Sequence, residues 1–178
     1  TCSPSIAISY GTGAAGGRQG KTGKHVTELL LRRGVRVRAF VRQSDERSEH
    51  LRALGAEVMQ GDFLDIPSVQ RAVRGAAAVY FAYPVQDGLL DATAIMAVAA
   101  REAGVKRLVN LSMLRPALDA PTPRMRQNYL SEQVLDWAGI GAAHVRATVF
   151  YENLRALVAG SLARQGTIRD IAAFRVTG

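Results

Sequence analysis

The residues best suited to chemistry in this sequence are the glycines between positions 11 and 23. They follow the apolar, β-prone run IAISY (6–10) and precede the periodic run KHVTELLLRR (24–33), so the sequence predicts a strand, a loop and a helix in that order. A helix N-terminus offers unpaired backbone N–H groups and the positive end of a dipole, and glycines let a phosphate group approach the backbone closely. The stretch therefore predicts a phosphate-binding loop, and the arrangement suits a dinucleotide.

The glycines can be grouped in three ways, and the sequence leaves the choice open. The first group follows the strand with the spacing Gly-x-Gly-x-x-Gly: Gly11, Gly13 and Gly16. The second precedes the helix with the spacing Gly-x-x-Gly-x-x-Gly: Gly17, Gly20 and Gly23. The third treats residues 15–22 as a relaxed Walker A motif for a nucleoside triphosphate, but no later apolar strand ends in an Asp that could hold magnesium. A Gly-rich turn without any ligand is the remaining alternative.

Length and composition indicate a single domain over residues 1–178. A chain of this length buries about 70% of its unfolded surface, which is enough for a hydrophobic core. The net charge is +8, yet the arginines are scattered over predicted helices and turns with few aromatic residues between them, so we expect no nucleic-acid partner. The apolar runs are too short to span a bilayer and the single cysteine cannot form an internal disulfide, so we expect a cytoplasmic protein that binds no membrane. The histidines lack metal-site spacing, so we expect no metal.

Strand-like and helix-like runs alternate after the glycine loop. The strand-like runs occupy 35–41, 56–62, 76–84 and 106–114, and helical patterns lie between them at 45–55, 65–73 and 89–105. This alternation predicts a parallel sheet, right-handed crossovers and helices on both faces. We therefore expect an α/β, Rossmann-like doubly wound fold, in which ligands bind at the carboxyl ends of the strands.

Three polar residues lie where these predicted strands end. Arg42 comes directly after the second strand, where an arginine accepts the 2′-phosphate of NADP, although it could also be one more surface arginine. Asp62 closes the third strand and could accept a hydrogen bond from an adenine amino group or cap a turn. Ser112 lies near the end of the fifth strand and could act in catalysis or bond a backbone group there.

Five segments resemble, in order and spacing, the NmrA-like group of atypical short-chain dehydrogenases. They are GKTGKHVTELLLRRGVRVRAFVR (20–42), GAEVMQGDFLD (55–65), AREAGVKRLVNLSML (100–114), LSEQVLDWAGI (130–140) and TVFYENL (148–154). The resemblance extends from residue 20 to about residue 157. It implies a nicotinamide cofactor bound across the sheet, with NADP expected ahead of NAD because of Arg42.

The same resemblance implies positions for the cofactor and the substrate. Four residues would lie near the pyrophosphate: Gly17, Gly20, Lys21 and Thr22. Arg42 would lie near the 2′-phosphate, and Asp62 and Phe63 near adenine. Three residues would border the nicotinamide side: Ala82, Tyr83 and Pro84. Three would border the substrate, at the start of a 150–178 remnant of a larger substrate-binding portion: Phe150, Tyr151 and Asn153.

The chain departs from this group in its longer glycine loop, its shorter tail and its catalytic residues. Ordinary short-chain dehydrogenases pair a serine with Tyr-x-x-x-Lys, in which the lysine lowers the tyrosine pKa so that the tyrosine can donate a proton. Here Tyr129 is followed four residues later by Gln133, which carries no charge. Tyr129 and Ser112 are the candidate catalytic residues, although Tyr129 would also fit an interfacial aromatic role on an amphipathic helix. Glu132 and Asp136 lie one turn apart on that helix, and a solvated face explains them.

Two main functions remain open from the sequence. The first is an NADP-dependent oxidoreductase that transfers a hydride to a conjugated or quinone-like small molecule, which depends on placing the acceptor well and less on acid catalysis. The second is an NAD(P)-binding regulator or a catalytically idle member of the group, which Gln133 favours. A P-loop nucleotide binder is a third interpretation, and the sequence leaves a homodimer open.

Overall fold

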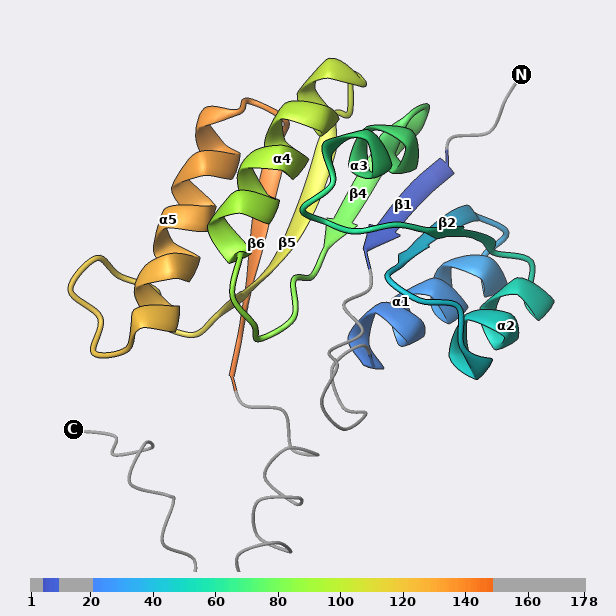
Figure 1. Cartoon of the computed structure of the whole chain (residues 1–178), viewed down its shortest axis with the longest axis horizontal. Helices are drawn as coiled ribbons and strands as arrows, with labels where there is room; N and C mark the ends of the chain where they lie inside the picture. Colours follow the sequence, from blue (N-terminus) through green and yellow to red (C-terminus); the bar gives the residue numbers. More distant parts are fainter. Residues whose placement is uncertain (1–4, 10–20, 149–178) are drawn as a thin grey trace, which may run out of the picture. The chain divides into compact units, whose positions relative to one another are not determined.

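The computed structural model describes residues 5–9 and 21–148. The chain divides into two compact units, Thr1–Arg146 and Ala147–Gly178, and nearly all described residues belong to the first. The expected remnant at 150–178 lies outside the described residues. Strands and helices alternate (Figure 1) in the order β1 Ser5–Ser9, α1 Lys21–Arg32, β2 Arg36–Val41, α2 Glu46–Ala53, β3 Glu57–Gln60, α3 Ile66–Val73, β4 Ala76–Phe81, α4 Leu89–Glu102, β5 Arg107–Met113, α5 Pro123–Trp137 and β6 Ala142–Ala147.

The strands form one sheet in the order β3-β2-β1-β4-β5-β6. β1 pairs in parallel with β2 and with β4, β2 with β3, and β4 with β5. The chain therefore winds outward from β1 to β3, returns to the other side of β1, and winds outward again in the opposite direction. Open α/β sheets bind ligands at the carboxyl ends of the strands beside such a reversal. The expected α/β, Rossmann-like doubly wound fold is confirmed.

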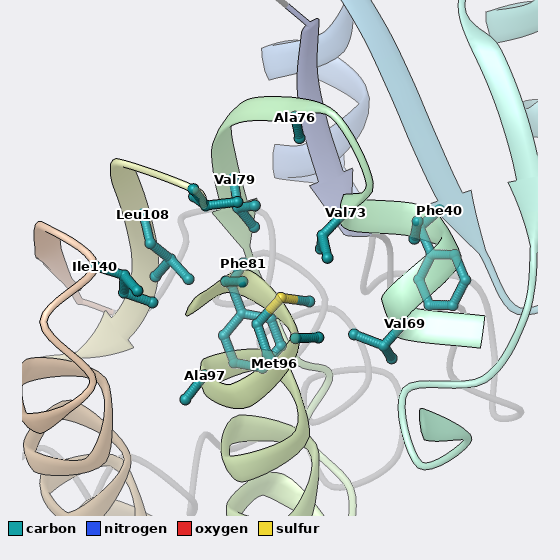
Figure 2. Packing of buried hydrophobic residues seen from close by; sticks show 14 of the residues in the cluster. Phe40, Val69, Val73, Ala76, Val79, Phe81, Met96, Ala97, Leu108 and Ile140 are labelled. Atoms are coloured by element: carbon teal, nitrogen blue, oxygen red, sulfur yellow. The ribbon is translucent and has the colours of Figure 1, made fainter. Parts of the chain in front are cut away.

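Helices cover both faces of this sheet (Figure 1). On one face, α1 and α2 pack on β2, with Leu30 and Leu51 against Val37 and Ala39. On the other face, α3, α4 and α5 cover a larger apolar cluster (Figure 2), whose residues include Phe40, Val69, Val73, Phe81, Met96, Ala97 and Leu108. β2 contributes to both clusters because its side chains alternate between the faces, as the sequence pattern of that strand predicts.

Side chains cap three of the helices at their N-termini. Asp45 accepts hydrogen bonds from two backbone N–H groups at the start of α2 and forms a capping box with Ser48. Asp65 caps α3, because its side chain accepts from the backbone N–H of Ser68 at 3.0 Å. Thr122 caps α5. Each cap satisfies a backbone donor that the helix itself leaves unpaired, so these helices begin at defined residues.

Two element boundaries differ from the sequence prediction. α1 begins at Lys21 rather than at residue 24, so that Gly23 lies in its first turn. β4 ends at Phe81 and does not extend to Pro84, because proline has no backbone N–H for the ladder and the chain turns away from the sheet there.

Gly61 follows β3 and packs against the core without a side chain. A Cβ at this position would lie 2.5 Å from Phe40 Cε2 and 2.8 Å from Ser68 Cβ. We expect Gly61→Ala to lower the free energy of unfolding by about 1–3 kcal/mol, because the phenylalanine ring and α3 must shift to admit the methyl group. Chemical denaturation measures the change. The double variant with Phe40→Leu should cost less than the sum of the single variants, and strict additivity would contradict the overlap.

Candidate functional site

Residues singled out in the sequence lie along the carboxyl ends of the strands. Arg42 directly follows β2, Asp62 comes two residues after β3, and Ala82 directly follows β4. Ser112 is the last residue but one of β5. Because the paired strands run parallel, these positions share one edge of the sheet, which is the edge where this class of fold binds ligands.

The first turn of α1 reaches the middle of the sheet at this edge. Gly23 is buried in that turn. The Thr22 side chain hydrogen-bonds Tyr80 on β4; burial raises the pKa of Tyr80, and this hydrogen bond opposes the increase. A buried glycine in the first turn of α1 favours the second grouping of glycines, whose third member it is. Gly17 and Gly20 lie outside the described residues, and Lys21 is described as the first residue of the helix.

Arg42 and Asp62 form an ion pair across the ends of β2 and β3. Arg42 Nε lies 3.5 Å from Asp62 Oδ2, and the two side chains are 49% and 44% exposed. Asp62 Oδ1 accepts a hydrogen bond from the backbone N–H of Leu64 at 2.9 Å, so this carboxylate closes a turn, which is one of its two expected roles. Asp45 is engaged elsewhere, because it caps α2 and pairs with Arg47 at 2.6 Å. Arg42 therefore presents a half-exposed positive charge at the edge of the sheet.

Phe63 lies in the core. Its side chain is 5% exposed and packs edge-on against the ring of Phe40, with the ring centroids 5.1 Å apart. It makes similar contacts with Phe81 at 6.0 Å and Tyr83 at 5.8 Å. The sequence resemblance implies that Phe63 lies near adenine, but with this side-chain orientation only its backbone is left to face a ligand at the edge.

The segment between β4 and α4 is held by hydrogen bonds from two sides. Within it, Tyr83 Oη donates to Asp87 O at 2.8 Å and Gln86 Nε2 donates to Tyr83 Oη at 3.2 Å. From α5, Arg124 donates to the carbonyl oxygens of Pro84 and Gln86 at 2.8 and 2.9 Å. Sequence reasoning missed Arg124, because a helical pattern does not indicate which distant carbonyls a side chain at its start will reach.

Ser112 and Tyr129, the two catalytic candidates, are not joined by a hydrogen bond. Ser112 is 5% exposed, and within the described part of the chain its Oγ has no hydrogen-bond partner. Tyr129 is half-buried on α5, and Gln133, one turn later, is half-buried too. The arrangement therefore supplies neither the lysine nor the serine–tyrosine hydrogen bond that would prepare a tyrosine to donate a proton.

The buried carboxylate of Glu132 forms an ion pair with the more exposed Arg146, next to Ser112. The carboxylate side chain is 1% exposed and accepts from Arg146 Nη2 at 2.7 Å and Nε at 3.2 Å. Burial would raise the pKa of Glu132, but Arg146, with smaller contributions from Ser112 and His144, holds that pKa below its ordinary value. Ser112 is thus close enough to lower the pKa of the Glu132 carboxylate, although its hydroxyl does not have the geometry of a hydrogen bond. The expectation of a solvated helix face is wrong for Glu132, whereas Asp136 is exposed and contacts His144 at 3.0 Å.

Three further expectations concern the substrate, metals and membranes. The expected substrate residues lie outside the described residues: Phe150, Tyr151 and Asn153. Within residues 5–9 and 21–148, no group of three or more His, Cys, Asp or Glu side chains could hold a metal ion. No helix of that same part of the chain has the length and apolar character needed to cross a membrane.

The sequence is similar to curated reductases over most of its length. It is 33% identical over 141 residues to the (4-alkanoyl-5-oxo-2,5-dihydrofuran-3-yl)methyl phosphate reductase of Streptomyces griseus subsp. griseus, an alignment that covers 77% of this chain and 47% of that protein. It is 27% identical over 138 residues to the NAD(P)H azoreductase of Xenophilus azovorans, covering 78% and 48%. The chain thus spans about half the length of the curated relatives it matches.

Solved structures share the fold. The NADPH-dependent quinone oxidoreductase of Escherichia coli, solved with NADPH, matches with a TM-score of 0.71 and 25% identity over 89% of this chain and 54% of that one. The triphenylmethane reductase of Citrobacter sp., solved with NADP(H), matches with a TM-score of 0.69 and 24% identity over 88% and 55%.

The Glu132–Arg146 pair makes stability depend on pH in a defined direction. Because the pKa of Glu132 in the folded chain lies below its value of about 4.3 in the unfolded chain, the pair stabilises the fold above that pH and is lost as the pH falls through the folded-state pKa. We expect Glu132→Gln to lower the free energy of unfolding at neutral pH by about 1–3 kcal/mol. It should also flatten the decline in stability below about pH 5. Denaturant unfolding over a pH series measures both effects.

Arg146→Met is the matched variant, because it leaves the buried carboxylate without its partner. That carboxylate then binds a proton more readily in the folded chain than in the unfolded chain, so the stability of this variant should rise relative to wild type as the pH falls from about 7 to about 5. Identical pH slopes in the wild type and both variants would contradict this role of the pair.

The family match includes the second half of the glycine loop, the helices from α1 to α5 and the strands from β2 to β6. It covers residues 17–151, most of the chain, and includes Arg42, Asp62 and the segment after β4. The matching solved structures are reductases with bound NADP(H) or NADPH that share this fold. This chain therefore belongs to the NAD(P)H-binding family.

Proposed function

We propose that this chain binds NADPH across the carboxyl edge of its sheet and supports hydride transfer to a conjugated or quinone-like small molecule. The observation that carries the proposal is the half-exposed guanidinium of Arg42, directly after β2 and beside Asp62. In doubly wound sheets this position meets the adenosine ribose, where an arginine accommodates a 2′-phosphate. The two reductases whose structures contain NADP(H) or NADPH support the same cofactor.

The residues at this edge fit such a cofactor. The N-terminus of α1 lies beside the reversal in strand order, where the positive end of the helix dipole favours an anion, so Thr22 and its neighbours would hold the pyrophosphate. Arg42 would hold the 2′-phosphate. Asp62 keeps one carboxylate oxygen outside its turn and would accept a hydrogen bond from adenine. The segment at residues 82–84 would border the nicotinamide.

A bound cofactor would supply a hydride from its nicotinamide ring. The chain would contribute by holding the ring and the acceptor face to face and by excluding water, with Phe150, Tyr151 and Asn153 proposed to border the acceptor. A conjugated acceptor suits this site, because Ser112 and Tyr129 lack the hydrogen bond that would prepare a proton donor. The similarity to an azoreductase, a quinone oxidoreductase and a triphenylmethane reductase supports the same class of acceptor.

A cofactor-binding protein without turnover is the second candidate. Gln133 in place of a lysine and the Ser112 hydroxyl without a hydrogen-bond partner among the described residues favour it. Nucleoside-triphosphate binding is not proposed, because the match to the NAD(P)H-binding family includes residues 17–22 of the glycine loop.

Titration with NADPH and NADH, followed by nicotinamide fluorescence, tests the cofactor. We expect NADPH to bind more tightly, and Arg42→Ala to weaken NADPH binding by about 10- to 100-fold, or about 1.4–2.7 kcal/mol, while NADH binding changes by less than about 3-fold. Arg33→Ala is the matched control, because it removes the same charge from an exposed position after the C-terminus of α1, and it should change neither affinity. Equal wild-type affinities would contradict the role of Arg42, and binding of neither cofactor would overturn the proposed function.

Oxidation of NADPH with a panel of quinones and azo dyes tests turnover. We expect Tyr129→Phe and Ser112→Ala to keep quinone turnover within about 5-fold of wild type, because a general acid contributes about 100- to 10,000-fold where one is used. A loss of more than about 100-fold would instead assign proton donation to the substituted residue. Tight NADPH binding without any oxidation would favour the second candidate.

A further inference from the structure

Arg124 lies in the first turn of α5, at the same edge of the sheet as the segment 82–88 between β4 and α4. The backbone of this turn is well fixed. Thr122 Oγ1 accepts from the backbone N–H of Met125 at 3.3 Å, and Asn128 Nδ2 donates to the Arg124 carbonyl at 2.9 Å. The Arg124 side chain therefore extends from a fixed base.

The guanidinium uses both of its outer nitrogens on carbonyl groups of this segment. Nη1 donates to Gln86 O at 2.9 Å and Nη2 donates to Pro84 O at 2.8 Å. A planar guanidinium holds two acceptors at once in a fixed geometry, which the point charge of a lysine cannot reproduce. Burial lowers the pKa of Arg124, and the nearby Tyr83 and Asp87 oppose that decrease. The guanidinium charge of Arg124 is thus partly shielded from solvent and lies against the segment 82–88.

Tyr83 holds the same segment from the side of the core. Its ring packs against Phe63 and Phe81, with centroids 5.8 and 6.4 Å away, while its hydroxyl donates to Asp87 O at 2.8 Å. At the end of the segment, Gly88 has a φ of 90°, and a Cβ there would lie 2.9 Å from the Tyr83 hydroxyl. The segment is therefore closed by a glycine, anchored to the core by Tyr83 and tied to α5 by Arg124.

We propose that Arg124 is a positioning residue that fixes the backbone of residues 82–84 against the nicotinamide ring. This inference rests on the proposed function, because only that function assigns residues 82–84 to the nicotinamide side. Arg124 would act through the segment, by holding the backbone that would border the nicotinamide ring of a bound cofactor. A misplacement of about 1 Å is enough to slow such a transfer by about 100-fold, even when the cofactor still binds.

Arg126, two residues later in the same helix, provides a matched control. Its Nη1 donates to Ala120 O at 2.6 Å, a carbonyl of the chain that leads into α5. Arg126→Ala therefore removes a side chain of the same type, and the same kind of hydrogen bond, without releasing the segment 82–88. If arginines in this part of the helix served stability alone, the Arg124→Ala and Arg126→Ala variants would behave alike.

The test compares wild type, Arg124→Ala, Arg124→Lys and Arg126→Ala as full chains, each checked for folding by thermal unfolding. Hydrogen–deuterium exchange is measured across residues 82–88, and NADPH binding and oxidation are measured with a quinone acceptor. We expect Arg124→Ala to speed exchange in this segment by about 10-fold and to lower kcat by about 10- to 100-fold, with the Kd for NADPH within about 3-fold of wild type. Arg124→Lys should resemble Arg124→Ala, and Arg126→Ala should resemble wild type. Added guanidinium ion at low concentration should restore part of the kcat of Arg124→Ala.

Four results would count against the proposed role of Arg124 or against the proposed function. Unchanged exchange in the Arg124→Ala variant overturns the inference, since the side chain then does not hold the segment. Faster exchange with a wild-type kcat also overturns it, because the segment then has no influence on transfer. Equal losses of kcat in the Arg124→Ala and Arg126→Ala variants would also overturn it, because both arginines would then act only through the stability of the fold. If the wild type itself oxidises no NADPH, the proposed function fails and the role in hydride transfer fails with it, while the exchange rates still show whether Arg124 holds the segment.

Discussion

The central position of β1 is the constraint on which the rest of the structure depends. Its backbone pairs with β2 on one side and β4 on the other, with Ile8 opposite both Ala39 and Tyr80. Because crossovers between parallel strands are right-handed, the connections leading to β3 and those leading to β6 place their helices on opposite faces. The two sets diverge at the carboxyl end of β1, where Thr22 of α1 meets Tyr80 of β4. Folds with this winding bind their ligands at this edge.

α5 carries both a buried carboxylate, Glu132, and a side chain at the carboxyl edge of the sheet, Arg124. The apolar cluster under α3 and α4 gives way to polar contacts between α5, β5 and β6, where Asn110 contacts His144 at 3.2 Å and Glu132 pairs with Arg146. A buried carboxylate without a partner is costly, so this pair favours the packing of α5 beside β6. Arg124 lies in the first turn of the same helix and contacts the segment after β4.

The distribution of positive charge follows from the direction of the helices. α1 to α4 each carry an arginine in the last turn, where a cation interacts favourably with the negative end of the helix dipole: Arg32, Arg52, Arg71 and Arg101. The connected helices run back along the parallel strands, so these C-termini lie toward the amino ends of the strands, away from Arg42. Arg42 is distinguished from these four arginines by its place at the carboxyl edge.

The sequence by itself determined the order of strands and helices and the position of Arg42 after a strand, because periodicity acts within a few residues. It could not reveal that Phe63 turns into the core or that Glu132 is buried, because burial depends on which distant elements pack together. Arg124 shows the same limit, since its partner Pro84 lies 40 residues away. Only the tertiary structure brings such groups together, because the winding of the chain about β1 decides which helix start meets which strand end.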